Sequence, residues 1–310
     1  LYLVNKQLST LENKFEIKAI LGNACNYDLL EKIFSENQVD VVFHAAAYKH
    51  VPLVEINPVE GVKNNIISTF NVCSAAEKTS VENVVFISSD KAVRPTNIMG
   101  ASKRLSELIV QAFSEKSSIN ENYDLKNTIF SMVRFGNVLD SSGSVVPLFR
   151  NQISNGGPLT LTHPKIIRYF MTISEASQLV LQSLSLANSG DLFLLDMGEP
   201  VLIKELAEQM IILSGKSLRN KENPQGDIEI KLTGLRPGEK LYEELLIDAE
   251  SSATEHPLIF RAKEKSINHQ KLFLMIEKLI SSLEKYDLLE SLKFLKELVP
   301  EWVEFRKKNN

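Results

Sequence analysis

The stretch ENVVFISSDKAVRPTNIMGASK, residues 82–103, decides the expected fold. It contains an apolar run, Asn83–Ser88, then the polar group Ser89-Asp90-Lys91, and it leads into a helical pattern at Asn97–Lys116. Continuously apolar strands that alternate with helices are typical of βαβ units, in which a parallel sheet is covered on both faces. Polar residues that follow such a strand lie at its carboxyl end, where ligands bind in open α/β sheets. The stretch therefore predicts an α/β fold with a candidate site at this strand end.

The same alternation extends to both sides of this stretch. Short runs rich in Val, Ile and Phe predict strands, and segments of helical period between them predict helices. The further predicted strands are Phe15–Leu21, Val39–Ala45, Thr128–Phe135 and Asp191–Met197, and the further helices are Tyr27–Glu36, Val59–Lys78 and Ser174–Ala187. Right-handed crossovers between parallel strands favour a doubly wound, Rossmann-like sheet.

The rhythm loosens after about residue 136, where glycine and proline interrupt the pattern. We expect residues 1–140 and about 170–200 to form the Rossmann-like domain. A smaller interleaved region with the C-terminal helices is expected at about 141–169 and 201–310. Near the end, six apolar residues repeat at helical spacing: Leu272, Met275, Ile276, Leu279, Ile280 and Leu283. They predict an amphipathic helix that packs on the body of the protein, with a partner-binding helix as the alternative.

Composition excludes several classes of protein. The 310 residues include 35 Lys and Arg against 39 Asp and Glu, a net charge of −4, which argues against broad nucleic-acid binding. No apolar run approaches the roughly 18 residues of a membrane span, so we expect no membrane contact by this segment. Cys25 and Cys73 suit a reducing compartment, and the five scattered histidines predict no metal site.

Two further groups of residues are candidates for chemistry. His44-Ala45-Ala46-Ala47 follows the strand Val39–Phe43, and its small side chains would let a flat ring or a pyrophosphate approach the backbone. Three arginines beside glycine- or proline-rich turns could form a local anion site, because the guanidinium binds phosphate through a bidentate fork. They are Arg134, Arg168 and Arg236. The plainer alternatives are a solvated strand end with a helix cap for Ser89–Lys91, a satisfied strand-end histidine for His44, and ion pairs for the arginines.

Five ordered stretches carry a family resemblance. They are VVFHAAAYKHVP (41–52), ISSDKAVRPTNIMGASK (87–103), RFGNVLDSSGSVVPLF (134–149), RYFMT (168–172) and LRPGEKLYEEL (235–245). Together they resemble the extended short-chain dehydrogenase/reductase superfamily, and within it the UDP-N-acetylglucosamine 4,6-dehydratases of the CapD-like polysaccharide-biosynthesis family. The resemblance implies that the larger domain binds NAD or NADP and that the smaller region binds the UDP-sugar.

The resemblance also implies a reaction and roles for residues. Hydride moves from sugar C4 to the nicotinamide, a base removes the C5 proton, water leaves from C6, and hydride returns to C6. Lys91 resembles the C5 base, Asp90 the acid at the C6 hydroxyl, and Ser89 the hydroxyl that bonds O4. The cofactor-binding positions implied are Lys103, Asn23, His44, Ala45, Ala46 and Asn65, and the substrate-binding positions are Lys49, Asn137, Arg168 and Arg236. Asp90 would need a raised pKa and Lys91 a lowered one; burial favours both shifts and their mutual attraction opposes them.

The sequence departs from the superfamily pattern at two positions. Met99 stands where most members have tyrosine, four residues before Lys103, and methionine has no titratable proton to exchange with the C4 hydroxyl. A methionine here resembles the long, membrane-anchored branch of the family, and it requires another base, either water or the Lys91–Asp90 pair. Asn23 follows Gly22 where an acidic residue often contacts adenine, and its amide can still form a hydrogen bond.

The beginning of the chain also differs from the pattern. The chain opens at Leu1 in helix-like sequence, and none of its thirteen glycines forms a G-x-G-x-x-G or G-x-x-G-x-x-G motif. We expect a piece of a longer protein that lacks the first β-α-β unit, on the order of 30 residues. The expected consequences for the 310 residues alone are a defective sheet, little affinity for the cofactor and little activity.

The leading interpretation is therefore a NAD(P)-dependent UDP-sugar 4,6-dehydratase, a lyase of capsule or O-antigen synthesis. The alternatives are a nucleotide-sugar 4-epimerase and a catalytically inactive nucleotide-sugar-binding module. We expect a cytoplasmic location, with the parent protein on the cytoplasmic face of the bacterial inner membrane. The choice of NAD or NADP, the configuration at C5, the exact sugar and a homo-oligomeric state stay open at the level of sequence.

Overall fold

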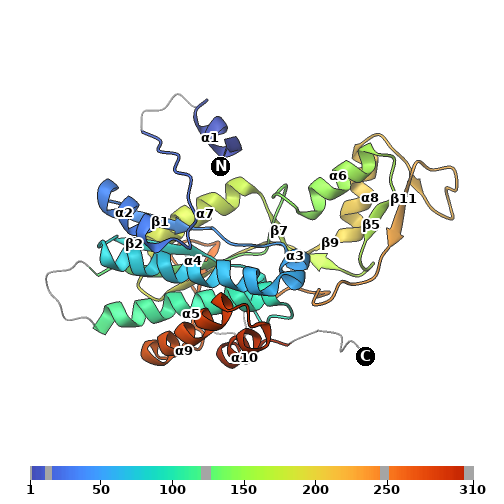
Figure 1. Ribbon diagram of the computed structural model, residues 1–310. Coiled ribbons are helices and arrows are strands. Elements are labelled where there is room, and N and C mark those ends of the chain that lie inside the picture. The colour runs from blue at the N-terminus through green and yellow to red at the C-terminus, as the bar shows by residue number, and fades with distance from the viewer. Residues whose placement is uncertain (1, 11–15, 120–126, 245–250, 304–310) are drawn as a thin grey trace.

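The computed structural model describes residues 2–10, 16–119, 127–244 and 251–303 (Figure 1). Its centre is a six-stranded sheet in the order β1-β2-β3-β8-β13-β12. These strands are β1 (Val41–His44), β2 (Asn83–Ile87), β3 (Ile129–Arg134), β8 (Leu192–Leu195), β13 (Ile259–Ala262) and β12 (Ser251–Ala253). The first four run parallel, whereas β13 is antiparallel to both β8 and β12. The mixed α/β fold with a mainly parallel sheet, expected from the sequence, is confirmed.

Helices cover the two faces of this sheet. Successive strand residues point to opposite sides, and the strands carry apolar side chains on both sides that need to be covered. On β2, Val84 and Phe86 pack into a core with α4 (Pro58–Lys78) and α5 (Ile98–Ile119), whereas Val85 packs on the other side with α7 (Ile173–Leu186). The remaining helices of this unit are α1 (Tyr2–Leu8), α2 (Tyr27–Asn37) and α3 (Val51–Ile56).

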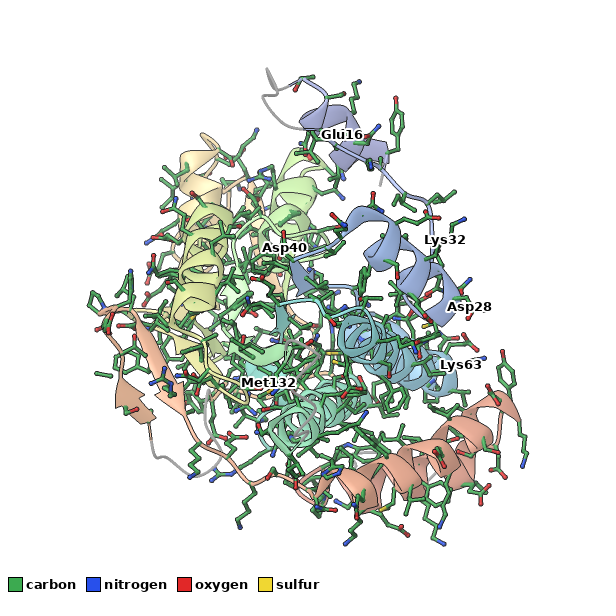
Figure 2. All side chains as sticks on the ribbon, turned by 90° about the vertical axis from the view of Figure 1, so that its left-hand side faces the viewer. Glu16, Asp28, Lys32, Asp40, Lys63 and Met132 are labelled. Carbon is green, nitrogen blue, oxygen red and sulfur yellow. The ribbon has the colours of Figure 1, made fainter. Side chains whose placement is uncertain are left out.

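The C-terminal helices α9 (His269–Glu284) and α10 (Leu288–Leu298) form an outer layer on α4 and α5 (Figures 1 and 2). Leu272, Ile276, Leu279 and Leu283 of α9 are buried in the same core as these helices. The sequence prediction of an amphipathic helix that packs on the body is therefore confirmed. Figure 2 places Met132, a fully buried residue of β3, near the centre of these layers.

A smaller region with its own core lies to the right in Figure 1. It combines a three-stranded sheet, in the order β10 (Leu218–Arg219), β11 (Ile228–Leu232), β5 (Leu159–Leu161), with helices α6 (Val145–Ser154) and α8 (Ile203–Leu213). Two short strand pairs connect the regions: β4 (Asn137–Val138) with β7 (Phe170–Met171), and β6 (Ile167–Arg168) with β9 (Val201–Leu202). The division into domains at the boundaries given above stays a prediction.

One predicted strand is wrong. Residues 16–21 of the predicted strand Phe15–Leu21 form no strand and are mostly exposed, and Phe15 itself lies outside the described residues. The physical reason is the lack of a hydrogen-bonding partner: in the described ranges β1 pairs with β2 only, and no ladder joins residues 16–21 to it. The other predicted strands and helices are confirmed, each within three residues of its predicted ends. None of the described helices is long and apolar enough to cross a membrane.

Candidate active site

The polar residues after β2 form a tight turn that stays attached to the sheet. Ser88 donates its backbone N–H to the carbonyl of Val133 (2.8 Å), and Asp90 donates to that of Phe135 (3.2 Å). Ser89 then caps a short 3₁₀ helix, η1 (Asp90–Ala92), by accepting the backbone N–H of Lys91 on its hydroxyl at 3.2 Å. The chain thus bends at the strand end, the condition needed for Ser89, Asp90 and Lys91 to face one site.

The ammonium of Lys91 is held by side chains from three parts of the chain. Its Nζ lies 2.8 Å from Oδ1 of Asp90, 3.3 Å from Oδ1 of Asn137 and 4.0 Å from Oε1 of Glu243. Ser89 also donates its hydroxyl to Asp90 at 2.8 Å. The side chains of Asp90 and Glu243 are 4% and 6% exposed, whereas that of Lys91 is 24% exposed. Of these three charged side chains, Lys91 is thus the one that solvent or a ligand can reach.

The electrostatics of this cluster differ from the expectation for Lys91. Burial alone would lower the pKa of Lys91, but the carboxylates of Asp90 and Glu243 raise it above its ordinary value. The lowered pKa that the implied role of Lys91 would need is therefore not found in this structure, because a second carboxylate adds to the attraction of Asp90. Burial raises the pKa of Glu243, although Lys91 acts in the opposite direction.

Glu243 was not identified from the sequence. It lies in the stretch LRPGEKLYEEL, but 152 residues (243 − 91) separate it from Lys91, and no spacing rule singles it out from Glu239 or Glu244. Only the path of the chain in the small region brings Glu243 to the Ser89–Lys91 turn.

Arg168 links this segment to the site. It is 8% exposed, and its guanidinium donates to the carbonyls of Lys240 (2.9 Å) and Leu241 (3.3 Å). Its Nη2 also lies 3.6 Å from Oε1 of Glu243. In this structure Arg168 therefore fixes the segment that carries Glu243, and its predicted contact with a substrate pyrophosphate stays a prediction.

A second group of buried polar residues lies at the carboxyl ends of β1 and β2. Lys103 donates its Nζ to the carbonyl of Ile87 (2.7 Å) and lies 4.2 Å from the ring centroid of Phe86; burial lowers its pKa to about 8. Burial, together with the charge of Lys103, lowers the pKa of His44 to about 3, so the imidazole is neutral. His44 Nε2 lies 3.2 Å from the hydroxyl of Thr69. His44 therefore has a hydrogen-bonding partner within the protein, as the alternative of a satisfied strand-end histidine expects.

The other predicted cofactor residues are spread around this edge. Asn65 is buried, and its side-chain amide bonds both backbone groups of Tyr48 and the hydroxyl of Ser102. Ala45 and Ala46 are exposed beyond the end of β1. Asn23 is also exposed, and its side chain accepts the backbone N–H of Cys25 (2.9 Å) in a turn.

The remaining predicted site residues occupy contrasting environments. Met99 is 3% exposed in the first turn of α5 and belongs to the large core. Lys49 and Arg236 are exposed. Partial burial and the nearby charge of Lys91 lower the pKa of Lys49, which places this ammonium within the field of the site.

Arg134 does not contribute to an anion site. Its side chain is fully buried and donates hydrogen bonds to Glu107 (2.6 and 2.5 Å) and to Glu264 (2.6 and 2.8 Å). The expectation that Arg134 forms part of a local anion site is therefore wrong, since two buried carboxylates already neutralise its guanidinium. Glu107 also accepts the hydroxyl of Ser88 at 2.5 Å, which connects this buried ion network to the residue before Ser89.

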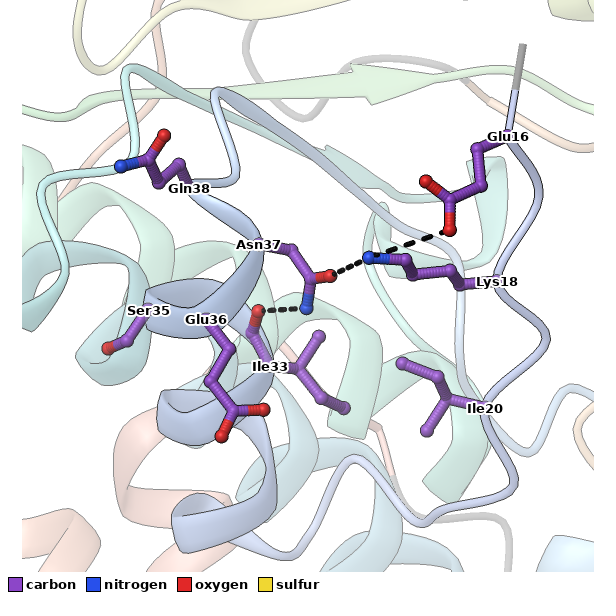
Figure 3. Close-up of a pocket in the computed structure, with 8 residues that line it drawn as sticks. All are labelled: Glu16, Lys18, Ile20, Ile33, Ser35, Glu36, Asn37 and Gln38. Carbon is purple, nitrogen blue, oxygen red and sulfur yellow. Dashed lines mark hydrogen bonds and ion pairs between the residues drawn. The ribbon is translucent and has the colours of Figure 1, made fainter.

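An open pocket of about 570 Å³ lies away from these residues, beside the C-terminal end of α2 (Figure 3). In it, Lys18 Nζ donates to Oδ1 of Asn37 (2.9 Å) and lies 3.8 Å from a carboxylate oxygen of Glu16. None of the predicted site residues lines this pocket, and its charged side chains are exposed. We therefore place the candidate active site at the Ser89–Lys91 turn.

The fold is that of the extended short-chain dehydrogenases/reductases, whose solved structures include dehydratases and epimerases. A family model described as polysaccharide biosynthesis protein matches residues 1–264, and the chain belongs to this family. It is 45% identical over 292 residues to the capsular polysaccharide biosynthesis protein CapD of Staphylococcus aureus, covering 94% of this chain and 46% of that protein. It is 51% identical over 219 residues to the probable polysaccharide biosynthesis protein EpsC of Bacillus subtilis, covering 71% and 34%. The chain thus spans less than half the length of these two relatives.

Further similarities extend to epimerases and to solved structures. The chain is 35% identical over 275 residues to a UDP-glucose 4-epimerase of Rickettsia canadensis, covering 87% of this chain and 75% of that protein. The crystal structure of Pen from Bacillus thuringiensis superposes with a TM-score of 0.71 at 33% identity, covering 89% and 86% of the two chains. The dTDP-glucose 4,6-dehydratase DesIV from Streptomyces venezuelae, at 18% identity and a TM-score of 0.66, shares the fold, covering 78% and 74% of the two chains.

Proposed function

We propose that this protein is a nucleotide-sugar 4,6-dehydratase that acts on UDP-N-acetylglucosamine in capsule or O-antigen synthesis. The observation that carries the proposal is the Lys91–Asp90 pair, with Nζ and Oδ1 2.8 Å apart at the carboxyl end of β2. Elimination of water across C5 and C6 needs a base for the C5 proton and an acid for the C6 hydroxyl. These two side chains supply both groups on one turn.

The pair already holds the one proton that the elimination requires. An ammonium and a carboxylate become an amine and a carboxylic acid when one proton moves from Lys91 to Asp90. Neutral Lys91 then removes the C5 proton while Asp90 protonates the C6 hydroxyl. The C6–O bond breaks, a C5–C6 double bond forms and water leaves. After reduction at C6, Lys91 returns a proton to C5. The pair recovers the proton that it gave to the C6 hydroxyl from the C4 hydroxyl, directly or through water, so the balance is the loss of one water.

The carboxyl ends of β1 and β2 fit the nicotinamide part of NAD or NADP. Ala45 and Ala46 expose small side chains there, next to buried Lys103 and neutral His44, and a flat group can lie against them. When bound, the dinucleotide would accept hydride from C4 and return it to C6. Lys103 would hold the ribose hydroxyls, with Asn65 supporting the backbone at Tyr48. Ser89 would bond O4, and since Met99 cannot exchange a proton, water or the Lys91–Asp90 pair would take the proton of the C4 hydroxyl.

For the UDP-sugar, the candidate contacts lie on the side of the small region. Asn137 and Arg168 flank the Lys91 cluster, and Lys49 and Arg236 are exposed cations that can reach an anionic ligand. We propose that these four residues contact the diphosphate and the sugar, and that the protein works on the cytoplasmic side of the membrane.

A 4-epimerase is the second candidate, favoured by the 35% identity to the Rickettsia UDP-glucose 4-epimerase. The two reactions differ at C5 and in mass. We expect the protein expressed from its complete gene, supplied with NAD or NADP, to convert UDP-N-acetylglucosamine to a product that has lost one water. In deuterium oxide the product should carry solvent deuterium at C5, because Lys91 exchanges its protons with solvent.

The matched variants are Lys91→Met and Asp90→Asn, which should stop water loss and leave the protein folded. An isomer of unchanged mass with no deuterium at C5 would establish the epimerase instead. Folded protein that binds the cofactor and the sugar nucleotide but produces neither would support the inactive module.

A further inference from the structure

A segment of the small region, residues 236–244, crosses onto the catalytic turn. The carbonyl of Gly238 accepts the hydroxyl of Thr96 (2.6 Å) and the amide of Asn97 (3.3 Å), and Lys240 Nζ donates to the carbonyl of Val93 (2.7 Å). Gly238 has a φ of +72°, and a Cβ there would lie 2.6 Å from the carbonyl oxygen of Thr96. The segment and the residues that follow Lys91 are therefore in direct contact through side-chain to backbone hydrogen bonds.

These contacts hold the segment that carries Glu243 close to Lys91. The Glu243 carboxylate is 6% exposed and lies 4.0 Å from Lys91 Nζ and 3.6 Å from Arg168 Nη2. Arg168, through the carbonyls of Lys240 and Leu241, prevents this carboxylate from turning away. An acid this deeply buried is costly to maintain unless it is paired, and the two cations next to it, Lys91 and Arg168, are both candidate site residues.

We propose that Glu243 is a positioning residue that holds Lys91 in place for removal of the C5 proton and stabilises the ammonium formed in that step. The inference rests on the proposed dehydratase function and adds a residue to its machinery. Asp90 contacts the C6 hydroxyl and gives its proton to it as the reaction proceeds, so Asp90 has a second task besides holding Lys91. Glu243 then supplies a second fixed negative charge beside the lysine.

The pH dependence of turnover tests this role. The charged groups that face Lys91 are Asp90 on its own turn, Glu243 on the crossing segment, Arg168 on β6 and Lys49 beyond β1. In the proposed mechanism the Lys91–Asp90 pair must hold one proton, so the basic limb of kcat/KM reports the loss of that proton from Lys91 in the free enzyme. Because the negative charge of Glu243 holds the pKa of Lys91 high, its removal should move this limb to lower pH.

The experiment compares Glu243→Gln with wild type in the protein expressed from the complete gene, with UDP-N-acetylglucosamine and added cofactor. We expect kcat to fall by about tenfold or more, and the basic limb to move down by on the order of one pH unit. Glu244→Gln is the matched control: this neighbouring carboxylate is 47% exposed and pairs with Arg94, so the limb should not move. An unshifted limb in Glu243→Gln would overturn the inference.

Glu243→Asp is a second test of the same role, and it does not remove the negative charge. It keeps the carboxylate but withdraws it by one methylene group, so kcat should fall and the limb should lie between those of wild type and Glu243→Gln. Wild-type kcat and an unmoved limb in folded Glu243→Asp would also overturn the inference. If wild type itself forms no dehydrated product, the proposed function fails first, and the two failures are thereby distinguished.

Discussion

The buried ion network beneath the catalytic turn should dominate the stability of the larger unit. In Arg134→Met the guanidinium is removed from a fully buried position where it donates hydrogen bonds to both Glu107 and Glu264. Breaking a buried ion pair by removing one partner typically costs about 3–5 kcal/mol, because the remaining charge stays desolvated. Here two carboxylates remain, but Arg104 Nη1 lies 3.2 Å from each of them and compensates in part. We therefore expect the free energy of unfolding to fall by about 3–5 kcal/mol.

The assay is urea unfolding followed by fluorescence of Trp302, the single tryptophan, which is 1% exposed and adjacent to a residue that pairs with Arg104. Arg150→Met is the matched control. Arg150 pairs with Asp140, but these side chains are 63% and 51% exposed, so the expected loss is about 0–1 kcal/mol. A loss below about 1 kcal/mol for Arg134→Met would refute the view that the network is energetically important.

The pH dependence gives the same experiment a second readout. Burial by itself would raise the pKa of Glu107, but Arg134, with help from Arg104 and Ser88, holds it below the ordinary value. A depressed carboxyl pKa stabilises the folded state above the pKa of the unfolded chain, and this stabilisation is lost as the pH falls through the folded pKa. The difference between wild type and Arg134→Met should therefore shrink on acidification below about pH 4.5. A difference that does not change with pH would contradict an ionic origin.

Two further predictions follow from contacts around the site. Gly100→Ala would place a Cβ in collision with the carbonyl oxygen of Lys91, so the Ser89–Lys91 turn must move. We expect turnover of the proposed reaction to fall by about 10²-fold, measured as product formation by folded protein. Wild-type turnover in Gly100→Ala would show that the turn tolerates displacement. For Lys103, whose pKa is lowered to about 8 from 10.5, the folded state binds its proton more weakly than the unfolded state. Stability measured by urea unfolding should therefore rise between about pH 8 and 10.5 in wild type relative to Lys103→Met, by about 1.4 kcal/mol per pH unit, and parallel curves would contradict this burial effect.

The repeating part of the fold was predictable because its signal is local. The buried strands β2 and β3 read as continuous apolar runs, and α4 and α5 repeat at helical spacing, so each element carries its own pattern. The run at Phe15–Leu21 carries the same local pattern and yet forms no strand over its described residues. A strand needs a neighbouring strand to complete its hydrogen bonds, and the sequence of the run does not show whether such a neighbour is present.

The site shows the same division between local and distant causes. Ser89, Asp90 and Lys91 were identified because they follow a strand directly, and the turn at η1 brings them together. Arg134 was misjudged for the opposite reason. Its partners Glu107 and Glu264 lie 27 and 130 residues away (134 − 107 and 264 − 134), so nothing near it shows that its charge is already neutralised.

The lysine itself illustrates why residue type and sequence position do not determine chemistry. From its neighbours alone, Lys91 has one carboxylate, and burial could have left it partly neutral. The crossing segment adds Glu243, and the balance moves toward the charged ammonium. A base that begins the cycle protonated must transfer its proton before it can act. Asp90 lies 2.8 Å from Lys91 Nζ and can accept this proton. The same proton then leaves with the C6 hydroxyl as water. The raised pKa of Lys91 is thus compatible with the proposed reaction only if Lys91 and Asp90 share one proton and act together. Turnover should therefore depend on the total protonation of the two side chains. A variant that removes either side chain should lose both the base and the acid function.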